Sequence, residues 1–325
     1  MKLRWGILGV AKINSRLIPA FKKAANAELG AIASRSLDKA RAAAKDAGIP
    51  VAHGSYEALL DDPNVDAVYV PLPNHLHAEW TRQAADRGKH VLCEKPLTPS
   101  AAEARALIDY CRAKNIRLAD GFMWPHHSRT ARIRALLDRG DIGPVRHVSG
   151  AFTFPLELDR ANIRLNAESA GGSLLDVGCY PVYGIRWAFQ AEPISAFATA
   201  SMQNGVDLAI SGLLTFADGG TATFDCGFTL PFRSWLEIVG AEGIVRVPGM
   251  WVPPVARATY EIERDGKTEV FTIEGEDQIA NMIQNFGKAV LEKRDPSPSP
   301  EEAVKTLRVL DALANSAHSG RVEKV

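Results

Sequence analysis

The first third of the chain alternates apolar, β-branched runs with amphipathic segments, and this alternation constrains the fold more than any other feature. The runs predict buried strands, and the segments between them predict helices. The predicted strands are residues 3–10, 29–34, 65–71, 90–93 and 116–121, and the predicted helices are residues 15–26, 37–47, 78–87 and 99–113. This spacing is typical of βαβ units, so we expect a doubly wound parallel sheet with helices on both faces. We place this domain at residues 1–122.

The remainder of the chain has a different pattern, in which strands follow one another. The predicted elements are a strand at 145–154, a helix at 173–189, strands at 194–202, 209–216, 221–229, 234–239, 243–247, 259–264 and 269–273, and helices at 277–292 and 300–317. Asp218-Gly219-Gly220 and Asp265-Gly266 are hairpin signals. Residues 123–325 therefore predict an α+β domain with a large, open, mostly antiparallel sheet. The closing helix could pack back on the first domain.

Composition excludes several classes of protein. The 325 residues include 38 Lys and Arg and 38 Asp and Glu, so the formal charge is zero, and a general nucleic-acid binder or a polybasic membrane protein is not expected. No apolar run approaches the roughly 20 residues that span a bilayer. Four widely spaced cysteines predict reduced thiols and a cytoplasmic protein; they are Cys93, Cys111, Cys179 and Cys226.

The turn after the first strand predicts a dinucleotide-binding (Rossmann) loop. Gly9 stands where the fingerprint needs a tight turn, Ala11 where the backbone meets the pyrophosphate, and Asn14 at the third position. Two of the three usual glycines are replaced, so the alternative is an ordinary α/β turn. Because this turn opens a helix whose N-terminus can hold phosphate, we expect Gly9, Ala11, Lys12 and Ile13 to contact the cofactor.

The end of the second strand favours NADP over NAD. An NAD site carries an acidic residue here, whereas this chain has Ser34, Arg35 and Ser36, with Lys39 one helical turn further on. Arg35 can pair with the 2′-phosphate and the serine hydroxyls can donate to it. The alternative is a solvated surface arginine.

Two further segments supply candidate catalytic residues. Glu94 and Lys95 follow the strand 90–93, at the carboxyl edge of the sheet where doubly wound folds bind ligands. Lys95 is a candidate proton partner or donor to a hydroxyl. If the segment after Gly171-Gly172 is helical, Asp176 and Tyr180 lie four residues apart on one face, so Tyr180 could act as acid or base while Asp176 orients the substrate or Lys95. The alternatives are a solvated lysine, a helix cap and a core aromatic.

Four motifs together resemble a known family. They are Arg4-Trp5-Gly6-Ile7-Leu8-Gly9, Pro73-Asn74-His75-Leu76-His77, Glu94-Lys95-Pro96-Leu97 and Gly171-Gly172-Ser173-Leu174-Leu175-Asp176-Val177-Gly178-Cys179-Tyr180. The chain resembles, over its whole length, the glucose–fructose oxidoreductase, inositol dehydrogenase and rhizopine catabolism (Gfo/Idh/MocA) family. Tyr rather than His at position 180 is similar to the branch with NADP-dependent D-xylose dehydrogenase, dimeric dihydrodiol dehydrogenase and glucose–fructose oxidoreductase.

The resemblance implies hydride transfer between nicotinamide and a sugar carbon, with Tyr180 as proton acceptor and Lys95 holding the reacting oxygen. It also implies that Leu72, Asn74, His77, Glu94 and Arg164 lie at the cofactor, and that relatives dimerise through the open sheet. The chain is therefore expected to form a homodimer or homotetramer. Substrate choice is expected to rest on side chains around Trp124, His126 and Asn162, together with Asp176 and Tyr180. The chain departs from many relatives at Pro125, where they carry Arg.

The histidines do not predict a metal site, because His75, His77, His126 and His127 have no carboxylate or thiol at ligand spacing. The leading hypothesis is an NADP-dependent sugar dehydrogenase or reductase, with a sugar or polyol as substrate. One alternative is a glycoside hydrolase of the same fold that retains NAD and cleaves by transient oxidation. Another is a non-catalytic NADP-binding sensor.

Overall fold

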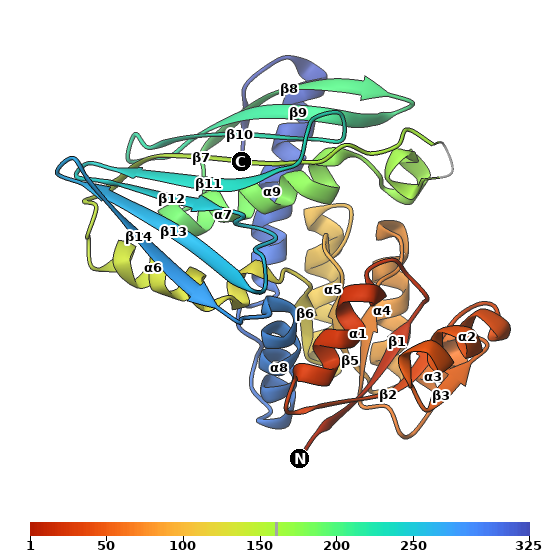
Figure 1. Ribbon diagram of the computed structural model, residues 1–325. Helices are drawn as coiled ribbons and strands as arrows, with labels where there is room; N and C mark the ends of the chain where they lie inside the picture. The colour runs from red at the N-terminus through yellow and green to blue at the C-terminus, as the bar shows by residue number, and fades with distance from the viewer. Residues whose placement is uncertain (160–161) are drawn as a thin grey trace. The chain divides into compact units, whose positions relative to one another are not determined.

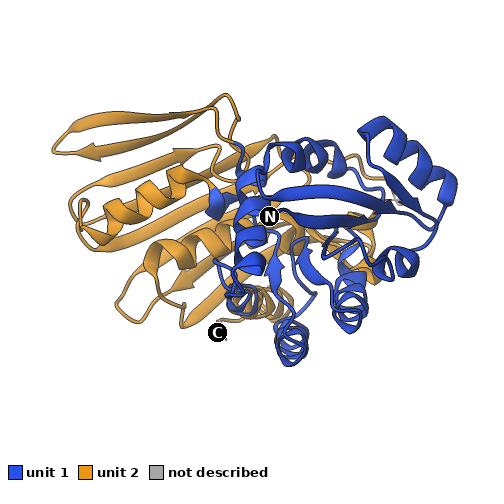
Figure 2. Ribbon diagram, turned by 90° about the horizontal axis from the view of Figure 1, so that it is seen from below, with its two compact units in different colours: residues 1–126, 277–304 blue, residues 127–276, 305–325 orange. Residues whose placement is uncertain are grey.

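The computed structural model describes residues 1–159 and 162–325 and divides them into two compact units (Figure 2). The first unit contains residues 1–126 and 277–304, and the second contains residues 127–276 and 305–325. The predicted boundary at residue 122 lies four residues before the observed crossing. The structure also returns residues 277–304 to the first unit, whereas the prediction left them in the second domain.

The first unit is built on a six-stranded parallel sheet, as expected for a Rossmann domain (Figure 1). Its strands are β1 (Leu3–Leu8), β2 (Ala27–Ala33), β3 (Val51–His53), β4 (Ala67–Val70), β5 (His90–Cys93) and β6 (Leu118–Asp120). They lie in the order β3-β2-β1-β4-β5-β6, and every pair is parallel. The order reverses between β1 and β4, and the crevice outside the carboxyl ends of such strands is where doubly wound sheets bind ligands.

Five helices of this unit begin at side-chain caps, whereas α1 (Asn14–Lys23) and α4 (His77–Asp86) begin without one. The capped helices are α2 (Leu37–Ala47), α3 (Tyr56–Leu60), α5 (Ala101–Ala113) and α8 (Gln278–Leu291), with the first residues of α9 (Glu301–Ser319). Ser36, Ser55, Ser100 and Asp277 each accept a backbone N–H of the first turn that follows. Ser299 accepts the N–H of Glu301 at 3.3 Å.

The core of the first unit explains why the chain returns to it. Trp5 of β1 is fully buried and contacts two phenylalanine rings, Phe21 of α1 at 5.2 Å and Phe286 of α8 at 5.4 Å between centroids. Each large buried side chain contributes about 1.5–3 kcal/mol through the area that it removes from water. At the surface Lys23 pairs with Asp277 at 2.8 Å. Helix α8 therefore completes one side of the Rossmann core.

The second unit contains a nine-stranded sheet in the order β14-β13-β12-β11-β7-β10-β9-β8-β15 (Figure 1). Its strands are β7 (Val145–Thr153), β8 (Ser195–Gln203), β9 (Val206–Thr215), β10 (Thr221–Gly227), β11 (Arg233–Gly240), β12 (Ile244–Pro248), β13 (Arg257–Arg264), β14 (Lys267–Glu274) and β15 (Glu323–Lys324). Every pair is antiparallel except β7 with β10. The predicted α+β domain with a mostly antiparallel sheet is confirmed.

Helices cover one face of this sheet. Helix α6 (Ser128–Asp138) packs on β13, α7 (Cys179–Phe189) packs on β7, β10 and β11, and α9 is tied to β8 by the Ala198 N–H, which donates to Ser316 Oγ at 3.0 Å. Strand β10 buries Ala222, Phe224 and Cys226, and its alternate residues point to the other face. That other face carries the partly exposed Phe197 and Leu213 beside a shallow hollow of about 350 Å³.

Short helical turns complete the structure. The 3₁₀ turns are Asn74–Leu76, Trp124–His126, Ile163–Leu165 and Ala167–Ser169, and a π-helical turn spans Leu174–Gly178. The helix predicted over residues 173–189 is thus a π turn followed by α7, and the π turn bears Asp176. None of the helices in the described part of the chain is long and apolar enough to cross a membrane.

Candidate functional site

The turn after β1 has the geometry of a close backbone approach. Gly9 has a φ of +132°, and a Cβ added there would lie 3.2 Å from Leu72 Cδ2. Asn14, buried at the start of α1, donates from Nδ2 to the Gly9 carbonyl at 2.9 Å. The residue that replaces the third fingerprint glycine therefore ties the turn closed. Ala11 and Ile13 are half-buried and Lys12 is exposed beside them.

The end of β2 presents two cations and two hydroxyls. Arg35 and Lys39 are exposed, and Ser34 is buried. Ser34 Oγ accepts the Ser36 N–H at 3.3 Å, and Ser36 Oγ accepts the Lys39 N–H at 3.4 Å. Because both hydroxyls act here as acceptors, their own hydrogens stay available to donate to an anion.

Arg35 also lines a pocket of about 490 Å³ in the first unit. Tyr56, Leu72, His75 and Trp80 lie on its wall, and Tyr56 meets Trp80 edge-to-face at 4.8 Å. Burial raises the pKa of Tyr56, and the nearby Arg35 guanidinium opposes that rise. Tyr56 and Trp80 were not predicted at the site. Tyr56 lies on α3, which has only five residues and no clear periodicity, and Trp80 lies within the predicted helix α4 with no motif that marks it.

His77 lies in the interior instead of on the wall of this pocket. Its ring is fully buried, with Nδ1 2.8 Å from the Pro96 carbonyl oxygen and Nε2 2.7 Å from that of Leu72. Burial lowers the pKa of His77 to about 4, and the neutral ring has one N–H to donate. His77, predicted at the cofactor, therefore connects the segment after β4 with the segment after β5 and offers no surface to a ligand. Asn74 is half-buried one turn before it.

The end of β5 holds Glu94 and Lys95 at the carboxyl edge of the sheet. The hydroxyl of buried Tyr69 donates to Glu94 Oε1, and the Lys95 N–H donates to Glu94 Oε2 at 3.3 Å. Lys95 is partly exposed, and the Lys95–Pro96 peptide is cis. The carboxylate of Glu94 is thus held by two donors while the Lys95 side chain reaches the surface.

Asp120, at the end of β6, is a neighbour of this pair that was not among the predicted site residues. Burial, with a smaller contribution from the charge of Glu94, raises the pKa of Asp120 to about 7, and the ammonium of Lys95 opposes the rise. The only sequence signal was its position at the end of a predicted strand.

In the second unit, glycines and one aspartate set up the turn that carries Asp176. A Cβ on Gly171 would lie 2.5 Å from the Arg164 carbonyl oxygen, and one on Gly172 would lie 2.3 Å from Asp207 Oδ1. Asp207 of β9 accepts the Ser173 hydroxyl at 2.6 Å and the Leu174 N–H at 2.7 Å. Asp207 therefore anchors the start of the π turn, a role that only the tertiary structure reveals.

The same segment brings two predicted residues together. Arg164 donates from Nε to Asp176 Oδ2 at 2.6 Å, and its guanidinium lies 6.0 Å from the centre of the Phe154 ring. Asn162 Oδ1 accepts the Arg164 N–H at 3.1 Å, and the Gly172 N–H donates to the Arg164 carbonyl at 2.9 Å. Asp176 thus has a cationic partner within its own unit.

Tyr180 lies at the start of α7 among aromatic rings. It is 3% exposed, with ring centroids 5.0 Å from Phe152 and 6.0 Å from Trp251. Lys95 belongs to the first unit and Tyr180 to the second. Their convergence on one substrate stays a prediction.

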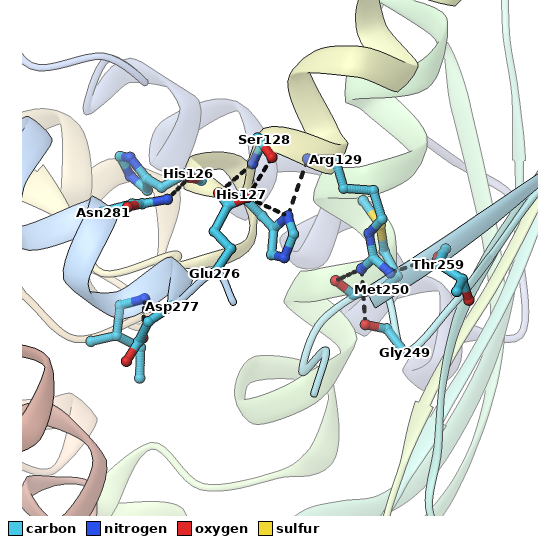
Figure 3. A network of polar contacts seen from close by, with 11 residues as sticks. His126, His127, Ser128, Arg129, Gly249, Met250, Thr259, Glu276, Asp277 and Asn281 are labelled. Carbon is cyan, nitrogen blue, oxygen red and sulfur yellow. Dashed lines mark hydrogen bonds and ion pairs between the residues drawn. The ribbon is translucent and has the colours of Figure 1, made fainter. Parts of the chain in front are cut away.

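Trp124 and His126, predicted at the substrate, are held by the first unit. Trp124 is fully buried. The His126 carbonyl accepts Asn281 Nδ2 at 3.0 Å, and His126 Nδ1 lies 2.9 Å from Asn285 Nδ2 (Figure 3 shows the first contact). Burial lowers the pKa of His126 to about 4. Both side chains are therefore engaged in packing or hydrogen bonding within the unit.

The adjoining residues of the second unit form a polar network (Figure 3). Glu276 accepts the Ser128 N–H at 2.6 Å and the Ser128 hydroxyl. Buried Arg129 donates at 3.0–3.2 Å to four backbone carbonyls, those of Pro248, Gly249, Met250 and Thr259. Burial lowers the pKa of Arg129 to about 10, so it stays charged at neutral pH. Among residues 1–159 and 162–325, no three His, Cys, Asp or Glu side chains gather as metal ligands would.

Comparison with known proteins agrees with this geometry. Residues 3–122 match the family model described as an oxidoreductase family with an NAD-binding Rossmann fold, GFO_IDH_MocA, and residues 130–246 match the GFO/IDH/MocA C-terminal domain. The chain belongs to the Gfo/Idh/MocA family. The resemblance drawn from the four motifs is confirmed.

Relatives of this Gfo/Idh/MocA chain include characterised enzymes. A D-xylose 1-dehydrogenase (NADP⁺) of Haloferax volcanii is 39% identical over 98% of each chain. A 3-ketoreductase from Actinomadura kijaniata, crystallised with NADP and TDP-benzene, is 33% identical with a TM-score of 0.91 over 97% of this chain and 98% of its own. An aldose–aldose oxidoreductase from Caulobacter crescentus is 27% identical with a TM-score of 0.93 over all of both chains.

Proposed function

We propose that this chain is an NADP-dependent oxidoreductase that moves a hydride between nicotinamide and a sugar or sugar-like hydroxyl or carbonyl. The observation that carries the proposal is the carboxyl edge of the six-stranded sheet, where Arg35 lines a pocket and Lys95 follows a fixed Glu94. Among the relatives, the D-xylose 1-dehydrogenase is named for NADP⁺ and a sugar, the 3-ketoreductase was crystallised with NADP, and the aldose–aldose oxidoreductase is named for sugars.

The residues at this edge fit the cofactor. The turn at Gly9 is closed by Asn14 and places Ala11, Lys12 and Ile13 at the start of α1, where a helix N-terminus can hold a pyrophosphate. The anion-binding set for the 2′-phosphate is Ser34, Arg35, Ser36 and Lys39. Leu72 lines the Arg35 pocket, while Asn74, Glu94, Lys95 and Arg164 are the remaining candidates for cofactor contacts. Bound NADP supplies the hydride-accepting ring, and the chain must do the rest.

Side chains of the protein would bind the reacting oxygen of the substrate and transfer its proton. In oxidation of an alcohol, Lys95 would donate a hydrogen bond to the reacting oxygen, and the phenolate of Tyr180 would accept the proton from that oxygen as the hydride leaves the C–H bond. In reduction the phenol of Tyr180 returns the proton to the carbonyl oxygen. Asp176, with Arg164 as its partner, orients a neighbouring hydroxyl. Asn162 belongs to the same loop as Arg164, and Trp124 and His126 would act on the substrate only indirectly, through the packing of the first unit.

The test is a panel of aldoses, polyols and ketoses assayed with NADP⁺ or NADPH by the absorbance of the reduced ring. Release of NADPH into solution with a free aldose supports the proposal. Cleavage of glycosides without net NADPH would indicate the retained-cofactor hydrolase, and cofactor binding with no turnover on any class would indicate a sensor.

We propose further that the protein works as a homodimer or homotetramer in the cytoplasm. The open face of the nine-stranded sheet, with its exposed Phe197 and Leu213, supports self-association, and four free buried cysteines suit a reducing compartment. Light scattering of the wild type and of Leu213→Glu tests the assembly: a stable dimer should shift to monomer in the variant, and an unchanged mass in both would count against this face.

A further inference from the structure

A third ionisable side chain stands beside the Glu94–Lys95 pair. Strands β5 and β6 run parallel, and Cys93 is the register partner of Asp120. Each is the last residue of its strand. The residues that follow both strands therefore share one stretch of the carboxyl edge.

Gly121 lets the two strand ends approach closely. A Cβ added at Gly121 would lie 2.7 Å from the Cys93 carbonyl oxygen and 3.1 Å from Glu94 Cα. Any larger residue would push the chain after β6 away from the end of β5. The glycine therefore keeps Asp120 against the base of Glu94.

The hydrogen bonds differ between the two carboxyl groups. Glu94 receives the Tyr69 hydroxyl and the Lys95 N–H. Asp120 Oδ1 is shielded from solvent and has no hydrogen-bond partner among the described residues. A backbone hydrogen bond from Gly121 favours the ionised form of Asp120. With one oxygen shielded and unpartnered, this carboxylate is still costlier to ionise than Glu94, which has two donors. The proton is thus expected on Asp120 and the negative charge on Glu94.

We propose that Asp120 takes up and releases a proton beside the Glu94–Lys95 pair, and so sets the charge that this edge presents to the nicotinamide end of the cofactor. The proposal rests on the proposed function. When Asp120 is neutral, the charges of Glu94 and Lys95 cancel. When it is ionised, the three groups carry one net negative charge, which favours the cationic oxidised ring over the neutral reduced ring.

The other groups near Asp120 do not supply this charge. Burial raises the pKa of the Cys93 thiol well above its usual range, so the thiol stays neutral. His77, near Lys95, has its pKa lowered to about 4 by burial and is neutral as well. Of these three groups, Asp120 has the pKa nearest neutrality, raised to about 7. Because Asp120 acts through the charge at Lys95, it is a positioning residue.

The first experiment measures dissociation constants of NADP⁺ and NADPH on the full-length protein by calorimetry, from about pH 5.5 to 8.5 on either side of the Asp120 pKa. In the wild type, the ratio of the NADP⁺ constant to the NADPH constant should fall about tenfold as pH rises, as one added unit charge nearby predicts. The contact between the 2′-phosphate and Arg35 contributes equally to the binding of NADP⁺ and NADPH, so it cancels in the ratio of their dissociation constants. Asp120→Asn should give a flat ratio, while Asp120→Glu and the exposed control Asp46→Asn should keep the slope.

The second experiment needs no cofactor. The pKa of Asp120 is raised above its unfolded value of 3.8, so the folded state holds the proton more tightly, and wild-type stability should fall as pH rises from about 4 to 7. Asp120→Asn cannot lose a proton there, so its melting temperature should gain about 3 °C or more on the wild type between pH 5 and pH 8. Parallel melting curves together with a pH-independent binding ratio would overturn the proposal. Failure to bind either cofactor would contradict the proposed function, and the melting curves would still decide the role of Asp120.

Discussion

The two units hold their candidate site residues in different ways. In the first unit, Arg35, Lys95 and Asp120 lie at or just after the ends of parallel strands, so the sheet sets the position of each backbone. In the second unit, Arg164 lies on a 3₁₀ turn and Asp176 on a π turn. Backbone contacts at Gly171 hold the first, and Asp207 anchors the second. At a strand end the sheet holds the backbone, so a change of side chain leaves the backbone in place. The segment at Gly171 packs so closely on the Arg164 backbone that it requires a residue without a side chain.

This difference suggests a division of work. In the first unit the sheet fixes the backbone independently of the functional side chains, so this unit should still bind cofactor when one functional group is removed. In the second unit, a methyl group added at Gly171 should displace Arg164 from Asp176. This loss should appear in kcat/KM for the sugar. The following substitutions test that division.

Lys95→Ala should have the largest effect, because it removes the donor to the reacting oxygen from an otherwise intact strand end. We expect kcat to fall by about 10³-fold or more, with the dissociation constant of NADPH changed by less than about threefold. Steady-state kinetics and calorimetry measure the two, and the exposed Lys45→Ala is the matched control. Near-normal turnover would remove Lys95 from the mechanism.

Gly171→Ala should come next. The added methyl would lie 2.5 Å from the Arg164 carbonyl oxygen, which is backbone and cannot rotate away. Displacing Arg164 from Asp176 should lower kcat/KM for the sugar by about 100-fold, a loss of the size that a small misplacement of reacting groups causes. NADPH affinity should change much less. Gly30→Ala is the control, since its methyl would meet only the Trp5 carbonyl at 4.0 Å. Equal losses of kcat/KM in both variants would show that the close contact at Gly171 does not position Arg164 for the reaction.

Arg35→Ala should weaken NADP⁺ binding by about 10- to 100-fold, because a charge-assisted pair with the 2′-phosphate is worth about 1.5–3 kcal/mol. Binding of NAD⁺ should stay within about twofold. Competition titrations with NADP⁺ and NAD⁺ measure both affinities. The matched control is Arg41→Ala, which removes an exposed arginine of α2. If both cofactors weaken equally, Arg35 acts on the pocket as a whole and does not select the phosphate.

His77→Gln should have the smallest effect on the chemistry and a visible one on stability. The ring spans the Leu72 and Pro96 carbonyls, and its loss should cost about 1–3 kcal/mol in the free energy of unfolding. The folded pKa of about 4 lies below the reference value of 6.5, so the unfolded state binds the proton first and wild-type stability should fall as pH drops from about 6.5 to 4. Urea unfolding at several pH values tests this. His75→Gln, an exposed neighbour, should show neither change.

Much of the fold could be predicted from the pattern of apolar and polar residues in the sequence. Helix α2 and strand β5 have the predicted bounds, since each has a clear period and a defined end. Helix α6 was missed because Arg129, a charge at a buried position, breaks its apolar stripe. The charge is stable there only because four carbonyls from distant segments surround it. No local pattern carries that information.

By itself, the sequence determined the Rossmann sheet, the mostly antiparallel sheet and the places of Gly9, Arg35, Lys95, Asp176 and Tyr180 along the chain, because these depend on period and on motif. Only the tertiary structure decided that residues 277–304 rejoin the first unit, that Asp207 anchors the π turn, and that Asp120 lies beside Glu94. Such pairings depend on strand register and on packing between residues far apart in the chain, which set the burial and the charge that each group experiences.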